Sequence, residues 1–252
     1  MGFFKIWKNI ISSPFEGFAQ VNDETKWFLP LIAILILIFL SIALTIPIMQ
    51  SDEYIGALVR ATVSQQTEKG VEMSLEQQTA MSEQLNSPII KKITIASALG
   101  GGIITFVIIM LLTALFIKLL SAIFKNKVKF LLIFKILIFI SIISIVQSLV
   151  KSGITLSGDW TRILNKVTDM AGLKQALSAS VSLAALFSVD KIGSNGYFLL
   201  DTLTDIFNWI YYIFLYIGLQ VSAGLTKNHA LKVTVISAVV FILIGFAFNF
   251  IT

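Results

Sequence analysis

The sequence predicts an all-α polytopic membrane protein: a bundle of five transmembrane helices with interfacial amphipathic helices and an extracytoplasmic helical hairpin. Of its 252 residues, 56% are hydrophobic and only 13% are charged, against roughly 25% charged in soluble domains. Four segments contain the roughly 20 mostly apolar residues that cross a bilayer core about 30 Å thick. A fifth reaches this length if its polar residues face protein. We treat 1–252 as a single membrane domain.

The expected spans follow the apolar runs in order. They are residues 27–49, 96–124, 130–150, 205–225 and 229–251, preceded by cytoplasmic interfacial helices in 1–26 and separated by outer loops at 50–95 and 151–204. Residues 173–189 are rich in Ala and Ser and only weakly apolar. They predict a membrane-edge or re-entrant helix, with a full span as the alternative. Lys5 and Lys8 interrupt the first apolar stretch and no small-residue cleavage site follows, so we expect no cleaved signal peptide.

The two short connecting loops set the expected orientation. Both are basic, "KNKVK" at 125–129 and "TKNHALK" at 226–232, and short basic loops stay in the cytoplasm. Five spans then place the N-terminus inside and the C-terminus outside the cytoplasmic (plasma) membrane. The net charge of +5 indicates basic loops beside an anionic leaflet rather than binding to nucleic acid.

The N-terminal segment predicts two short helices that meet at a corner. Apolar and basic residues alternate at helical spacing in 3–11, as in a helix lying in the membrane interface. Pro14 ends this helix and can begin another. Ser13 and Glu16 then have the spacing of a capping box. The corner is either a simple elbow leading into the first span or a docking surface for a partner.

The outer loops also carry helix signals. Ser74 and Gln77 have capping-box spacing, and a helix over 52–68, a break at Gly70 and a second helix before Pro88 predict the hairpin. In the second outer loop, Trp160 begins a run of apolar residues at helical spacing. This pattern predicts a helix lying flat, with the Trp ring at headgroup level.

Polar residues inside the expected spans mark a candidate intramembrane site. Their spacing of four, three and four places one set on a single face of the fourth span, and facing partners come from the third and fifth spans. The residues are Asp201, Asp205, Asn208 and Tyr212, with Ser141, Ser144 and Asn249 as partners. Three interpretations remain open: Asp205 caps the helix start and the others are packing contacts; the carboxylates bind a cation or relay protons; or the stripe recognises a lipid headgroup or partner.

Two further charges lie within spans. Lys118 and Lys135 are each about two helical turns from the basic 125–129 loop, so we expect both to snorkel to the inner headgroups or contact lipid. With no cysteine and a single histidine, His229, the chain offers no nucleophile–base pair. We therefore predict no catalytic residues, no cofactor and no metal site. An intramembrane enzyme ranks last among the function classes, because Asp201 and Asp205 could form an acid/base pair but nothing positions a substrate.

Three stretches resemble one known family. "SPFEGF" followed by "TKWFLP", the Gln/Glu-rich first outer loop, and "LTDIFNWIYYIFLYIGL" at 203–219 together resemble the Yip (Ypt-interacting protein) domain family. Asp205, Phe207, Trp209 and Gly218 match its pattern best. The resemblance implies a five-span bundle with a cytoplasmic N-terminus. Eukaryotic members are associated with Rab-type GTPases and vesicle traffic and have a long polar cytoplasmic N-terminal region, whereas only 26 residues precede Trp27 here. The chain looks like a prokaryotic member, which argues against GTPase binding.

These observations favour one function class. The amphipathic segments and the resemblance predict a protein that organises or contacts membrane lipids, other membrane proteins or copies of itself. The alternative is a small transporter or an ion or proton pathway that uses the polar face of the fourth span.

Overall fold

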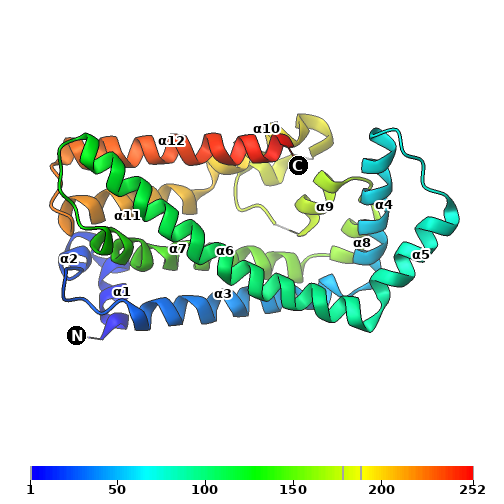
Figure 1. The fold of residues 1–252 in the computed structure, drawn as a ribbon, viewed down its shortest axis with the longest axis horizontal. Helices are drawn as coiled ribbons and strands as arrows, with labels where there is room; N and C mark the ends of the chain where they lie inside the picture. Colours follow the sequence, from blue (N-terminus) through cyan, green and yellow to red (C-terminus); the bar gives the residue numbers. More distant parts are fainter. Residues whose placement is uncertain (1, 178, 188, 252) are drawn as a thin grey trace. The chain divides into compact units, whose positions relative to one another are not determined.

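The computed structural model describes the backbone of residues 2–177, 179–187 and 189–251 (Figure 1). Helices are the only regular elements in these ranges, which confirms the all-α class. In the described residues, four helices are long and apolar enough to cross a membrane. A fifth span is added if one bent pair of helices crosses as a unit. The polytopic helical membrane architecture is therefore confirmed.

The four long helices occupy the expected apolar runs. They are α3 (Phe28–Met49), α6 (Pro88–Ile123), α7 (Phe130–Ser157) and α12 (Lys227–Ile251). Helix α6 begins at Pro88 rather than at 96, because Ser87 accepts a hydrogen bond from the backbone N–H of Ile90 and a proline is well suited to the first helical turn. The helix then continues without interruption through Gly100, Gly101 and Gly102.

The fourth expected span is not a single straight helix. Helix α10 (Val189–Thr204) and helix α11 (Ile206–Val221) meet at Asp205 and are bent by 51°. At a rise of about 1.5 Å per residue, the 16 residues of α11 alone are shorter than a bilayer core. In the described part of 173–189, the structure contains the end of α9 (Met170–Leu177) and the short 3-10 helix η1 (Leu183–Leu186), neither of which has the length of a span.

Backbone contacts divide the chain into two compact units, which we describe separately. The first unit comprises 1–38, 103–147 and 202–252. It contains α1 (Phe3–Ser12), α2 (Pro14–Ala19), α11, α12 and parts of the long helices. Its central helix is α7, in which all eight residues from 133 to 140 are buried. Helices α11 and α12 pack side by side (Figure 1).

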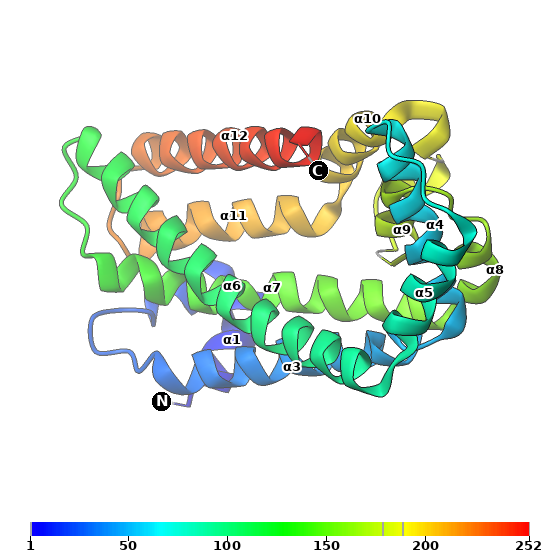
Figure 2. The same cartoon turned by 45° about the vertical axis from the view of Figure 1, so that its right-hand side comes forward.

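The second unit comprises 39–102 and 148–201. Helices α4 (Asp52–Glu68) and α5 (Leu75–Asn86) form the expected hairpin, and α4 also packs on α8 (Trp160–Asn165) and α9 (Figure 2). The Ser74–Gln77 capping box is present in both directions, at 3.3 Å and 2.9 Å. The Arg60 guanidinium of α4 donates to the carbonyl oxygens of Leu164 and Val167 at 2.7 Å and 2.9 Å. These bonds tie the end of α8 to the hairpin.

Candidate functional site

The N-terminal corner, residues 3–19, has two apolar faces. One face packs into the first unit, where Ile6, Trp7 and Ile10 are at most 5% exposed. On the adjacent side of α1, between the buried face and Lys5 and Lys8, Phe4 is 68% exposed and Ile11 is 58% exposed. A soluble helix of this length has one apolar stripe and one polar face. A second apolar face is stable only where lipid or another protein covers it.

The turn between α1 and α2 does not form the capping box predicted for Ser13 and Glu16. Pro14 opens α2 as expected and Glu16 lies in its first turn, but the Ser13 side chain makes no capping hydrogen bond. The reason is that Ser13 also ends α1, with its N–H donating to the carbonyl oxygen of Asn9 at 2.7 Å. This double role gives it a ψ of 74° rather than the extended value of an ordinary N-cap.

The corner is docked on α11 of the same chain. Phe18 is fully buried and meets the ring of Phe214 edge-on, with 6.2 Å between ring centroids. Gly218 makes room for it, because a Cβ there would lie 3.1 Å from the Phe18 ring. The Ser222 hydroxyl donates to the carbonyl oxygen of Phe18 at 2.7 Å. The corner is therefore fixed to the bundle by side-chain packing and by a hydrogen bond from the Ser222 hydroxyl to its backbone.

Lys135 does not snorkel to lipid as the sequence predicted. It is only 2% exposed, and its ammonium group donates to the carbonyl oxygens of Asn22 and Asp23 at 3.1 Å and 2.6 Å. The loop after the corner folds over α7 and presents carbonyl oxygens, which hold the charge more closely than distant headgroups would. Lys118, by contrast, is exposed on α6, where lipid contact stays a prediction.

Asp205 lies at the break between α10 and α11 and is fully buried. Its carboxylate accepts hydrogen bonds from the N–H of Phe207 at 2.9 Å and from the Gln147 amide of α7 at 2.6 Å. The side chains of Asn208 and Trp209 donate to carbonyl oxygens of the last turn of α10, at Thr202 and Leu203. These bonds satisfy backbone groups that the break leaves without helical partners.

The predicted stripe of Asp201, Asp205, Asn208 and Tyr212 requires one continuous helix, so the break at Asp205 removes its geometric basis. The carboxylate of Asp201 has other partners: the Ser180 and Ser182 hydroxyls, at 2.5 Å and 2.8 Å, and the Lys151 ammonium, at 3.6 Å. Tyr212 is half-buried and meets the ring of Tyr211 edge-on.

The structure places two of the predicted partners of the stripe, Ser141 and Ser144, on α7. Ser141 is buried and donates to the carbonyl oxygen of Leu137 within its own helix, and Ser144 is half-buried. The side chain of Asn249 lies outside the described residues. Gln147, which sequence reasoning missed, is the partner on α7. Its signal was available, because it follows Ser144 by three residues and is an amide within an apolar run.

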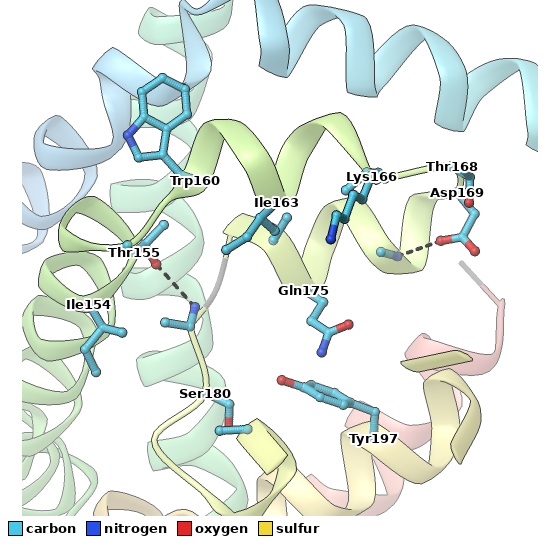
Figure 3. A pocket seen from close by; sticks show the side chains of 16 residues that line it. Ile154, Thr155, Trp160, Ile163, Lys166, Thr168, Asp169, Gln175, Ser180 and Tyr197 are labelled. Carbon is cyan, nitrogen blue, oxygen red and sulfur yellow. Dashed lines mark hydrogen bonds between the residues drawn. The ribbon is translucent and has the colours of Figure 1, made fainter. Parts of the chain in front are cut away.

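A cavity of about 480 Å³ lies in the second unit (Figure 3). Its walls come from the end of α7, from α8, from the loop between α8 and α9, from α9 and from Tyr197 of α10. Two hydrogen bonds in the lining hold this shape. The N–H of Gly172 donates to the Asp169 carboxylate at 2.6 Å, and the N–H of Ala179 donates to the Thr155 hydroxyl at 3.3 Å. Figure 3 shows Lys166, Gln175 and Tyr197 directed toward the open space.

The described lining of this cavity contains one basic and one acidic side chain. These are Lys166 and Asp169, and Tyr197 is the third titratable group among the described lining residues. Next to the lining, Asp159 caps α8, and hydrogen bonds from the Thr161 hydroxyl and the Arg162 N–H lower the pKa of its carboxyl group. That group therefore stays ionised at neutral pH. No cluster of three His, Asp or Glu side chains able to hold a metal occurs in the described part of the chain.

Comparison with protein families gives a match that covers nearly the whole chain. The family model described as the Yip1 domain matches residues 8–249. The chain belongs to the Yip1 domain family. No curated protein and no solved structure matches it significantly. The family resemblance inferred from the sequence is therefore confirmed, and the Yip1 domain includes most of the corner, the Asp205 break and the whole cavity.

In this Yip1 domain, Lys135→Met should destabilise the loop that leads from the corner to the first span. The substitution keeps an unbranched side chain, one atom shorter, but leaves the carbonyl oxygens of Asn22 and Asp23 without their donor. We expect a loss of roughly 1–3 kcal/mol in unfolding free energy. Faster proteolytic cleavage within 20–26 and a lower melting temperature would measure it. Lys118→Met, at the exposed lysine, should leave both unchanged. Equal effects of the two substitutions would contradict the hydrogen bonds from Lys135 to the loop.

Proposed function

We propose that this Yip1-domain protein is a non-enzymatic membrane-organising protein that acts on lipid through its N-terminal corner. The single observation that carries the proposal is the two-faced corner. Its inner face is buried against the bundle, while Phe4, Ile11 and Phe15 are each more than half exposed. Because the chain is an integral membrane protein, lipid is the nearest cover for this outer face.

The arrangement supports insertion at the boundary between headgroups and acyl chains. An interfacial helix places its apolar side about 5–10 Å into this boundary and its basic side chains against anionic headgroups. Lys5 and Lys8 are exposed next to Phe4 and Ile11 on α1 and are suited to that contact. The docking of Phe18 on α11 would couple the inserted helix to the spans. An inserted helix that is fixed to the spans displaces lipid in one leaflet and not in the other.

We assign the corner to the cytoplasmic leaflet of the cytoplasmic membrane, with the C-terminus outside. The two basic loops support this orientation, because Lys and Arg in short loops favour the cytoplasmic side. Asp23, which follows the corner, forms an ion pair with Lys129 of the first basic loop. The corner and that loop would therefore lie at the same membrane surface.

The competing function is an ion or proton pathway through Asp205. Such a pathway needs water or an ion at the carboxylate. The burial of Asp205, together with its bonds to Gln147 and Phe207, supports a structural role at the break instead. We therefore place membrane organisation first.

Reconstitution of the full chain tests the proposal. A variant with Phe4, Ile11 and Phe15 all changed to serine removes the outer apolar face and leaves the buried face intact. In vesicles of phosphatidylethanolamine and phosphatidylglycerol, we expect the unaltered protein to reduce vesicle diameter or form tubules, as seen by cryo-electron microscopy. The triple variant should lose most of this effect at equal protein density.

A matched control changes exposed apolar residues elsewhere. Val71, Leu75 and Ile89 are 51%, 80% and 71% exposed, and their serine variant should reshape vesicles like the unaltered protein. Equal melting temperatures of the three proteins would exclude misfolding as the cause. Full reshaping by the corner variant, or its loss in the control, would overturn the proposal.

A further inference from the structure

We propose that the cavity of the second unit binds the phosphate headgroup of one phospholipid, whose acyl chains lie along α7. This site shares no residue with the corner, and the inference does not depend on the function proposed for it. It rests on three features of the cavity: unpaired polar groups, an apolar wall that continues onto a membrane helix, and a tryptophan in the lining.

The first feature is a pair of polar groups without partners. Among the described residues, neither the Lys166 ammonium nor the Tyr197 hydroxyl makes a hydrogen bond or ion pair, although both line the cavity. Figure 3 shows them approaching the open space from different elements. A phosphate diester accepts hydrogen bonds from both kinds of group and neutralises the ammonium. The ligand chemistry is therefore anionic.

The second feature is the apolar wall. Ile154 and Ile163 line the cavity and are 45% and 48% exposed. One turn back along α7, Val150 is also 39% exposed, and residues four apart share a helix face. This apolar strip runs from the cavity along a helix that passes the length and composition test for a membrane span. It offers a path for acyl chains, which a soluble anion would not need.

The third feature sets the depth in the membrane. Trp160 lines the cavity just after α7 ends at Ser157. Tryptophan concentrates at the membrane–water interface, where its ring is near the headgroups. A site at the end of a span and beside such a residue lies where phospholipid phosphates are found. The cavity volume is also within the range of about 300–1,000 Å³ that is usual for small-molecule sites.

The charge balance favours an anionic lipid over a zwitterionic one. Asp169, an acidic residue of the lining, accepts a hydrogen bond from the N–H of Gly172. Among the described residues, Lys166 forms no ion pair with Asp169 or with another carboxylate. Phosphatidylglycerol supplies one net negative charge to neutralise the Lys166 ammonium, whereas phosphatidylcholine is zwitterionic and supplies no net charge.

Lipid titration of the purified full chain tests the site. Native mass spectrometry would count phosphatidylglycerol molecules retained by the unaltered protein, by Lys166→Gln, by Tyr197→Phe and by the double variant. We expect one tightly retained lipid, about tenfold weaker retention in Lys166→Gln, and a further loss in the double variant. Lys69→Gln, at an exposed lysine after α4, should retain the lipid fully.

Three comparisons separate the possible outcomes. Displacement of the lipid by millimolar inorganic phosphate would indicate a soluble-anion site and overturn the proposal. Equal retention of phosphatidylcholine, or equal loss in Lys69→Gln, would overturn it as well. Ile154→Ser should weaken retention of long-chain lipid more than retention of a dihexanoyl analogue. Vesicle reshaping should survive Lys166→Gln, and lipid retention should survive the corner variant, so either proposal can fail alone.

Discussion

Gly17→Ala should detach the N-terminal corner from the bundle and lower the unfolding free energy by about 3 kcal/mol, near the upper end of ordinary overpacking costs. A Cβ at this position would lie 2.4 Å from the backbone nitrogen of Ile10 and 2.6 Å from its Cα. These are backbone atoms of α1, so no side-chain rotation can relieve the clash. The two helices must separate, and Phe18 then loses its place against Gly218.

Three measurements would detect this change: the melting temperature in detergent, the fluorescence of buried Trp7, and the rate of proteolysis within 20–26. The matched control is Gly100→Ala on α6, where no atom lies within 4 Å of the added Cβ. In a helix interior this change should be neutral or stabilising by roughly 0.5–1 kcal/mol. If Gly17→Ala melted at the same temperature as Gly100→Ala and kept Trp7 buried, the close approach of α1 and α2 would be disproved.

The same variant connects stability to function. If the corner must be fixed to the bundle in order to reshape a membrane, Gly17→Ala should reduce vesicle reshaping even though Phe4, Ile11 and Phe15 are unchanged. A detached amphipathic helix can still insert into lipid. It would no longer transmit that insertion to the spans.

Two capping motifs show which local features could be predicted from the sequence. Ser74 forms its predicted box because the loop before it is free to adopt the extended backbone of an N-cap, with ψ of 159°. Ser13 has the same motif and fails, because it must also end α1. The spans were predictable for a related reason: about 20 apolar residues need a helix whatever their neighbours are. Local sequence predicts where a helix begins or ends only when the residue at that position does not also belong to a second helix.

Two lysines show where sequence reasoning stopped. Lys118 and Lys135 have similar neighbours in the chain, yet one is exposed and the other is buried under carbonyl oxygens of a loop more than 100 residues away. No periodicity encodes that contact. The Asp205 break has the same origin. An aspartate at a helix start was foreseeable, but its pairing with Gln147 depends on how α7 packs against α11.

Asp205→Ala should be the most damaging substitution within the apolar helices. It removes the N-cap of α11, which typically contributes about 0.5–2 kcal/mol. It also leaves the half-buried Gln147 amide without its acceptor, at a cost of about 1–3 kcal/mol. Together these effects give an expected loss of roughly 1.5–5 kcal/mol. The melting temperature and the proteolytic sensitivity of the 202–206 region would measure this loss. Ser144→Ala on α7 is the control, because the Ser144 side chain makes no hydrogen bond among the described residues.

Asp205→Asn separates the structural role from the ion-pathway alternative. Asparagine keeps an oxygen that can accept from the Phe207 N–H, and Gln147 can rotate its amide to present an oxygen to the new amide group. The unfolding free energy of this variant should therefore be within about 1 kcal/mol of that of the unaltered protein, because a neutral hydrogen bond replaces a charged one. A proton or cation pathway through the carboxylate would lose its charge completely. Transport would be established if vesicles with the unaltered protein showed ion flux and vesicles with this stable variant showed none. A stable variant with unchanged flux and unchanged vesicle reshaping would leave Asp205 as the residue that holds the bend.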